Sequence, residues 1–116
     1  MMDTTWLTFE LGVQAFEARD YNGAVERFGR VLDADPGNMQ VREYLARAYF
    51  HRASLPLAER ELRVLLEHNP TDDYATLLLA RTLERQSRHE EAAALRRRLA
   101  ALTGDPSHLA GHRAGV

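Results

Sequence analysis

The sequence contains no cysteine and no lysine among its 116 residues. Without cysteine, the chain cannot form disulfide bonds, thiolate zinc sites or cysteine nucleophiles. All fifteen basic residues are arginines, whose guanidinium groups suit bidentate contacts with carboxylates or phosphates. A genome that favours arginine codons would produce the same bias, so the absence of lysine alone indicates no function.

Long apolar runs are also absent, because no stretch approaches the roughly 18 residues of a membrane span. The segment from Met1 to Trp6 has no basic stretch followed by an apolar one, as a secretory signal would. We therefore expect a cytoplasmic protein without a membrane partner. Its composition, 45% hydrophobic and 28% charged, is that of an ordinary globular domain.

The residue patterns of catalysis and of nucleic-acid binding are missing as well. His108 and His112 are one helical turn apart, but neighbouring glycines disfavour the helix that a shared metal would need. No glycine-rich phosphate loop is present. The run Arg96-Arg97-Arg98 spreads over roughly 200° of a helix surface, with no aromatic residues interleaved for stacking on bases. We expect no enzyme activity, cofactor, metal site or nucleic-acid partner.

What the sequence does have is a repeat. Pro36, Pro70 and Pro106 lie 34 and 36 residues apart, and a period near 34 is typical of helical-hairpin arrays. With Pro36 and Pro70 placed at position 32, the repeats start at Thr5, Met39 and Asp73. The pattern predicts six helices, over residues 5–18, 21–34, 39–52, 55–68, 73–86 and 89–102.

Helix-start signals support these limits. Thr4, Asn38 and Asp72 precede the first helix of each repeat and are expected to be N-caps. Ser87-Arg88-His89-Glu90 fits the capping-box pattern before the last helix. Pro56 falls in a first helical turn, where no backbone hydrogen bond is lost.

Interior positions recur at the same period. Position 8 is Gly12, Ala46 and Ala80, and position 20 is Ala24, Ala58 and Ala92. These small residues would let the two helices of each hairpin approach closely. Larger residues stand at positions 7, 24 and 27; they are Leu11, Leu45 and Leu79, then Phe28, Leu62 and Arg96, then Val31, Leu65 and Leu99.

On these residues the chain resembles a tetratricopeptide repeat (TPR) protein, of the small stand-alone type common in bacteria. The family pattern is W-x2-L-G-x2-Y, then A-x3-F, then P. Leu11-Gly12, Ala24, Phe28 and Pro36 match it in the first repeat, and Leu45-Ala46, Tyr49, Ala58, Leu62 and Pro70 match it in the second. The resemblance implies an all-α, right-handed solenoid of three helix-turn-helix hairpins with six antiparallel helices.

The third repeat departs from the pattern, because Arg96 replaces a large apolar residue and Pro106 arrives two residues late. We interpret Arg96 as the solvated end of the array, or as a place where a partner helix docks. We expect a TPR domain over residues 1–106, with repeats at about 5–38, 39–72 and 73–106. Residues 107–116 are expected to be a flexible tail.

TPR proteins bind peptides or helices on a concave face that the first helix of each hairpin lines. The family resemblance places the same five repeat positions in this groove. They are Trp6, Phe9, Val13, Phe16 and Glu17 in the first repeat, Gln40, Glu43, Arg47, Phe50 and His51 in the second, and Tyr74, Leu77, Arg81, Glu84 and Arg85 in the third.

The groove is apolar in the first repeat and partly basic in the other two. We expect a protein or peptide partner with an apolar segment followed by acidic residues or a free carboxylate. Chaperone-tail-binding TPR domains hold that carboxylate with lysine and asparagine at positions 5 and 9, where this chain has Phe9 and Val13. A co-chaperone of that type is therefore not expected.

Other readings of these residues stay open. Phe16 could turn inward beside Ala15, Trp6 could cover the first hairpin, and the charged groove residues could pair with one another as a solvated surface. The function that we expect is a protein-interaction adaptor or scaffold. The alternative is a self-associating unit that buries Trp6 and Phe9, or the end near Arg96, in a homodimer.

Overall fold

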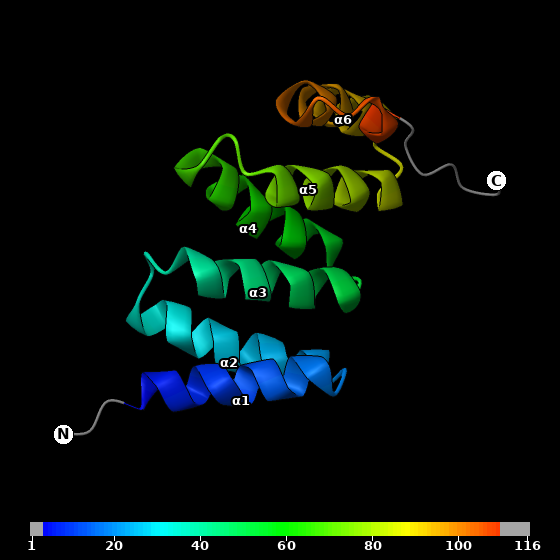
Figure 1. Ribbon diagram of the computed structural model, residues 1–116. Helices are drawn as coiled ribbons and strands as arrows, with labels where there is room; N and C mark the ends of the chain where they lie inside the picture. Colours follow the sequence, from blue (N-terminus) through cyan, green and yellow to red (C-terminus); the bar gives the residue numbers. More distant parts are fainter. Residues whose placement is uncertain (1–3, 110–116) are drawn as a thin grey trace. The chain divides into compact units, whose positions relative to one another are not determined.

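The computed structural model describes residues 4–109, which form six α-helices and one short 3-10 helix and contain no strand. The helices labelled in Figure 1 are α1 Thr5–Glu17, α2 Tyr21–Ala34, α3 Met39–His51, α4 Leu55–His68, α5 Asp73–Arg85 and α6 His89–Thr103, and the 3-10 helix η1 Pro106–Leu109 follows them. The predicted all-α class is confirmed, and no predicted helix end is wrong by more than one residue. The chain divides into two compact units, Met1–Glu61 and Leu62–Val116, with the division inside α4.

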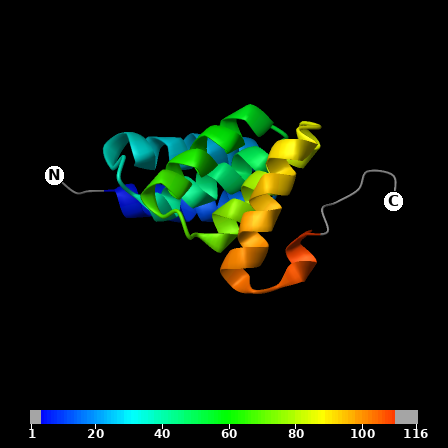
Figure 2. The same ribbon diagram turned by 90° about the horizontal axis from the view of Figure 1, so that it is seen from above.

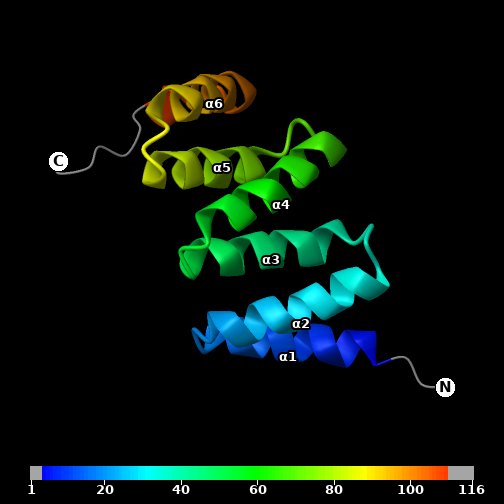
Figure 3. The same cartoon turned by 180° about the vertical axis from the view of Figure 1, so that it is seen from behind.

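In the first unit, α1, α2 and α3 lie side by side in chain order (Figures 1 and 3). Gly12 of α1 is buried against Phe28 of α2. A Cβ atom on Gly12 would lie 2.7 Å from Cε1 of Phe28, closer than carbon atoms pack. The predicted need for a small residue at position 8 is confirmed. The core cluster comprises Ala24, Phe28, Val31, Leu32, Val41, Leu45 and Ala48.

A buried ion pair joins α3 to the first part of α4. The guanidinium of Arg42 donates to Oε2 of Glu61 at 2.6 Å and to the carbonyl of Pro36 at 2.8 Å. The side chains are 15% and 7% exposed, respectively. Arg42 occupies position 4, where the TPR pattern has tryptophan. Its long side chain fills space there and carries its charge to a carboxylate.

In the second unit, α5 pairs with α6, and η1 folds back beside the end of α6 (Figure 2). Ala80 on α5 and Ala92 on α6 are both buried, as their repeat positions predict. Thr76 and Thr82 are buried too, and each hydroxyl donates to the backbone carbonyl four residues earlier. Burial therefore leaves no unsatisfied hydroxyl at these two positions.

The helices α1, α3 and α5 end in the same way. Arg19, Ala53 and Ser87 all stand at position 15 of their repeats, and all adopt left-handed backbone conformations, with φ of 62°, 63° and 60°. The residue after each donates its N–H to the carbonyl five residues earlier; in the first turn, Asp20 donates to Ala15 at 2.8 Å. This is the Schellman arrangement, in which a left-handed residue reverses the chain and satisfies helix-end carbonyls.

The N-cap residues predicted for α1, α3 and α5 are confirmed, and the capping box predicted for α6 is wrong. Asn38 Oδ1 accepts from the N–H of Val41 at 3.1 Å, and Asp72 caps α5 in the same way. Thr4 is the N-cap of α1, but its side chain accepts no hydrogen bond there; its backbone carbonyl accepts from the N–H of Thr8. The capping box at Ser87 does not form, because that residue is occupied in the left-handed turn and Arg88 is the N-cap of α6.

The prediction that Arg96 is solvated is also wrong. This residue is 7% exposed, and its guanidinium makes a bidentate ion pair with Glu84, from Nε at 2.8 Å and from Nη2 at 2.9 Å. The pairing from Glu84 raises the pKa of Arg96 against the lowering effect of burial. The charge is buried because the matching charge lies opposite it on α5. Arg97 and Arg98, by contrast, are exposed.

The C-terminal segment begins with ordered structure. Ser107, His108 and Leu109 belong to η1, so the expected tail boundary at residue 107 falls inside this element. Two hydrogen bonds hold the turn that leads into η1: the N–H of Asp105 donates to Thr103 Oγ1, and the N–H of Ser107 donates to a carboxylate oxygen of Asp105. The rest of the predicted tail, with His112, lies outside the described residues, and the domain limits stay a prediction.

Candidate functional site

Predicted groove residues of α1 and α3 meet in one aromatic cluster of the first unit. Phe9 lies edge-on to Tyr44, with ring centroids 5.5 Å apart, and Phe16 contacts Tyr44 at 6.2 Å. Phe16 also lies edge-on to His51 at 5.7 Å. Each such pair stabilises by about 0.5–1.5 kcal/mol beyond the burial of its area. We call this set the aromatic surface; it comprises Phe9, Phe16, Tyr21, Tyr44, Phe50 and His51.

The guanidinium of Arg47 covers part of the aromatic surface. Its central carbon lies 4.9 Å from the ring centroid of Phe16 and 5.2 Å from that of Tyr44. Cation–π contacts of this kind contribute about 0.5–1 kcal/mol at exposed sites. Within residues 4–109, no carboxylate pairs with Arg47. The ring contacts position the charge but leave its N–H groups able to bind an added anion.

Two members of the aromatic surface were missed by the sequence reasoning. Tyr44 stands at position 6, which the family pattern does not assign to the groove, and Tyr21 opens α2. The spacing carried a usable signal, because Tyr44 lies three residues before Arg47 and such pairs are neighbours on a helix. Tyr21 stacks on His51, with centroids 5.1 Å apart and planes inclined by 14°.

The remaining predicted residues of the first unit differ in exposure. Trp6 is 67% exposed, so it does not cover the first hairpin closely. Val13 and Phe16 are half-buried and pack against the core cluster. Phe16 therefore turns inward, which was the alternative prediction for this residue. Gln40 is exposed, and Glu43 and Phe50 are half-buried.

In the second unit, the predicted groove residues lie along α5. Tyr74 is 40% exposed, Leu77 is half-buried, and Arg81 and Arg85 are exposed. Glu84 does not join them, because its side chain is only 9% exposed and is paired with Arg96. The exposed charges among the predicted groove residues of α5 are therefore those of the two arginines, without the acidic residue expected beside them.

The described residues offer little for catalysis. Within 4–109, no three histidine, aspartate or glutamate side chains gather as metal ligands. The helices of that same stretch are all too short or too polar to cross a bilayer. The carboxyl of Asp105 has a lowered pKa, because its oxygens accept hydrogen bonds from the backbone N–H and then the hydroxyl of Ser107. Asp105 comes just before η1 in the second unit, whereas the aromatic surface belongs to the first unit.

Comparison with protein families decides the classification. The family model for the tetratricopeptide repeat matches residues 15–81, more than half of the chain. The chain belongs to the tetratricopeptide repeat family. TPR domains mediate protein–protein interaction and are not an enzyme fold. The comparison with curated proteins finds no match.

Solved structures support the TPR fold over most of the chain. The first TPR domain of Spaghetti (RPAP3), bound to the HSP90 peptide SRMEEVD, superposes with a TM-score of 0.80 at 22% identity, covering 91% of this chain and 84% of that one. The Arabidopsis OM64 TPR domain gives 0.80 at 20% identity, with 91% and 88% covered. A mutant of MamA gives 0.81 at 25% identity, with 87% and 74% covered.

Proposed function

We propose that this TPR chain is an adaptor that binds a peptide or helix of a partner protein on the first helices of its hairpins. In the first unit the proposed binding surface is the aromatic surface with Arg47; in the second unit it is the set of groove residues that the sequence predicts on α5. The ligand carries an apolar segment next to acidic residues or a free carboxylate. The cytoplasmic location expected from the sequence remains part of this proposal.

The observation that carries the proposal is the placement of Arg47 over Phe16 and Tyr44. A guanidinium held on two rings loses little further freedom when it binds a carboxylate, and it presents planar N–H donors beside an apolar contact area. Aromatic residues and arginine are also the side chains that most often dominate binding energy at protein interfaces. Together they favour a ligand that is both apolar and acidic.

The relatives support this class of ligand without naming it. The RPAP3 domain holds the peptide SRMEEVD, which combines acidic residues with apolar ones. In this chain, Phe9 and Val13 replace the lysine and asparagine that hold the terminal carboxylate in chaperone-tail-binding TPR domains. We therefore propose that Arg47 and Arg81, not that clamp, bind the acidic groups.

The test is a comparison of variants against one captured partner. Partners are isolated from the native cell extract on the wild-type chain, and the binding segment of each is then titrated by calorimetry. Arg47→Glu combined with Arg81→Glu should weaken binding at least roughly 100-fold, since like charges placed against each other at an interface cost several kcal/mol. Arg30→Glu with Arg97→Glu makes the same charge change on second helices and should leave affinity within a few-fold. Unchanged affinity in the first double variant would refute the proposal.

Homodimerisation is a second candidate, favoured by the apolar start of α1. Trp6 is 67% exposed and Leu7 is 42% exposed, on consecutive positions of the same helix. Light scattering across a dilution series measures this directly. A dimer that dissociates on dilution, and that Trp6→Ala converts to monomer, would establish the second function; a monomer at all concentrations would exclude it.

A further inference from the structure

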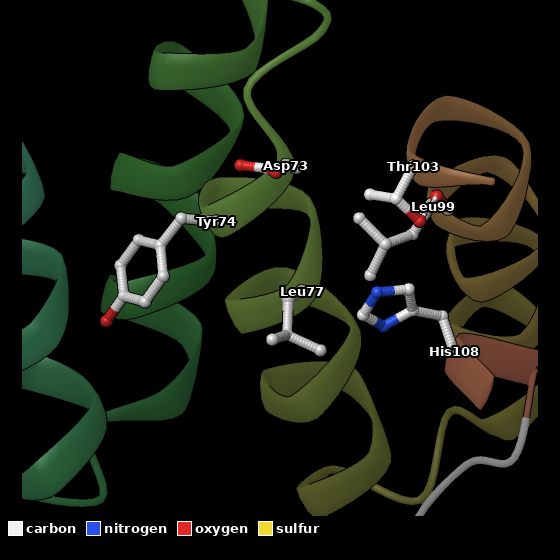
Figure 4. Close-up of a pocket in the computed structure, with 6 residues that line it drawn as sticks. All are labelled: Asp73, Tyr74, Leu77, Leu99, Thr103 and His108. Atoms are coloured by element: carbon white, nitrogen blue, oxygen red, sulfur yellow. Dashed lines mark hydrogen bonds between the residues drawn. The ribbon is translucent and has the colours of Figure 1, made fainter. Parts of the chain in front are cut away.

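A small pocket opens in the second unit, between α5, the end of α6 and η1. Its volume is about 200 Å³. In Figure 4, Leu99, Thr103 and His108 lie together, Leu77 stands across from them, and the ring of Tyr74 points away from this group. The lining residues are Asp73, Tyr74, Leu77, Leu99, Thr103 and His108. Four of the six were not predicted to lie in the groove; they are Asp73, the first residue of α5, Leu99 and Thr103 of α6, and His108 of η1.

The η1 side of this pocket is held in place by the buried ion pair between Arg96 and Glu84. The Nη1 atom of Arg96 donates to the carbonyl of His108 at 3.3 Å, while Glu84 holds the other side of the same guanidinium. Asp105 ties the preceding turn to Thr103 and Ser107 through hydrogen bonds of 3.2 and 2.9 Å. The pocket is therefore preformed, so a ligand need not order η1 when it binds.

The size of the pocket limits its occupant. A protein cavity of about 150 Å³ binds one benzene molecule, so about 200 Å³ accepts a single aromatic side chain and little more. Leu77 and Leu99 supply the apolar contact for such a ring. Tyr74 also lines the pocket, but its ring is 40% exposed and points away from the leucines in Figure 4.

The charge near the pocket is negative. The carboxylate of Asp73 is exposed at the first residue of α5 and forms no hydrogen bond or ion pair with any residue in 4–109. A second carboxylate, that of Asp105, lies 3.9 Å from Nε2 of His108. A cation held near these groups gains Coulomb energy that an anion in the same place loses.

We propose that this pocket binds an aromatic side chain that stands next to a cationic group in a protein partner. The ligand segment is thus opposite in charge to the one proposed for the aromatic surface. The inference rests on the proposed function only in taking the ligand to be a protein; binding at the pocket itself is measurable without that partner.

Two small molecules with the same ring but opposite charges distinguish the effect of ligand charge from that of ligand size. Tyramine carries an ammonium group, and 4-hydroxyphenylacetate carries a carboxylate on an equivalent position. Each is titrated at neutral pH into the full ¹⁵N-labelled chain, and backbone amide shifts are followed. Tyramine should shift the amides of Tyr74, Leu77 and Thr103 with millimolar affinity, as suits a ring-sized ligand. Its binding should be at least about 3-fold tighter than that of 4-hydroxyphenylacetate.

Two variants test the assignment. Asp73→Asn keeps the shape of the pocket and should remove most of the preference for tyramine, whereas Leu77→Phe fills the pocket and should weaken both probes. Absence of saturable shifts at these amides, or equal affinity of the two probes in the wild type, would overturn the proposal.

The pocket proposal and the proposed function can be refuted independently of each other. Arg47→Glu changes the first unit only, so it should leave tyramine binding unchanged while it weakens binding of the captured partner. If the double variant Arg47→Glu with Arg81→Glu leaves partner affinity intact, the proposed function is wrong and the tyramine result stands. If tyramine does not bind, the pocket proposal is wrong whatever the partner does.

Discussion

The buried pair between Glu84 and Arg96 allows a direct test of the energetics of the second unit. Replacing Glu84 with alanine removes both charged hydrogen bonds, at 2.8 and 2.9 Å, and leaves a guanidinium that is 8% exposed with the carbonyl of His108 as its remaining acceptor. Each charged hydrogen bond contributes about 1.5–3 kcal/mol, and loss of one partner of a buried pair costs about 3–5 kcal/mol. We therefore expect Glu84→Ala to lower the free energy of unfolding by about 3–5 kcal/mol.

The matched control is Glu26→Ala. Glu26 accepts from Arg30 at 2.6 Å, but the two side chains are 62% and 67% exposed. An exposed pair one helical turn apart contributes about 0.3–0.5 kcal/mol. Urea unfolding of the full chain, followed by circular dichroism, measures both variants under the same conditions. The contrast isolates burial as the cause, since both changes remove one carboxylate that pairs with one arginine.

A double replacement completes the argument. Glu84→Leu with Arg96→Leu removes both charges together and restores the apolar residue that position 24 has in the other repeats. Such replacements are often neutral or stabilising by about 1–4 kcal/mol, so the double variant should be at least as stable as the wild type. If Glu84→Ala costs no more than Glu26→Ala, the pair is solvated in solution and the reasoning is refuted.

Three further predictions concern single residues. Gly12→Ala should destabilise the chain by about 1–3 kcal/mol, since its methyl group would lie 2.7 Å from Phe28, whereas Gly29→Ala, with no atom within 4 Å, should stabilise it by about 0.5–1 kcal/mol. Urea midpoints that move in the same direction for both would contradict this. Asn38→Ala should cost about 1 kcal/mol through the lost N-cap of α3, which the same unfolding experiment measures. Carbon-detected NMR titration should give Asp105 a pKa below 3.8; because its folded pKa is lowered, its contribution to stability is present above the unfolded value and disappears as the pH falls through the folded one. A pKa at or above 3.8 would show that the turn contact is absent in solution.

Helix limits could be predicted closely because local chemistry determines them. Proline stands near the end of the first two repeats, Asn38 and Asp72 cap the helices that follow, and buried small residues recur at repeat positions 8 and 20. Each of these signals acts within a few residues along the chain. They define the hairpins without any knowledge of what lies across the core.

Arg96 could not be predicted in this way, because its environment depends on a residue twelve positions away. Read alone, an arginine at an apolar position indicates a solvated surface. Yet Glu84 at position 12 also replaces a residue that is aromatic in the other two repeats, Phe16 and Phe50. Two charges of opposite sign replacing apolar residues within one repeat are a sign of a buried pair, and their coincidence was visible in the sequence.

The aromatic surface was predicted only in part. Phe9, Phe16 and Arg47 were found because their repeat positions face the groove in the family. Tyr44 was missed, since its role comes from contacts with α1 that a position-by-position pattern does not encode. Ring contacts between helices depend on side-chain direction, and a single sequence does not determine that direction.

The repeated left-handed turns bear on how this chain could change over time. A left-handed backbone costs a non-glycine residue roughly 1–2 kcal/mol, and the cost recurs once in every repeat, at Arg19, Ala53 and Ser87. Glycine at any of these positions would recover part of it, offset by the greater freedom of glycine in the unfolded chain. The three residues lie in the turns and are not themselves members of the aromatic surface or of the pocket. Thermal tolerance can thus rise or fall in three similar steps while the binding residues stay as they are.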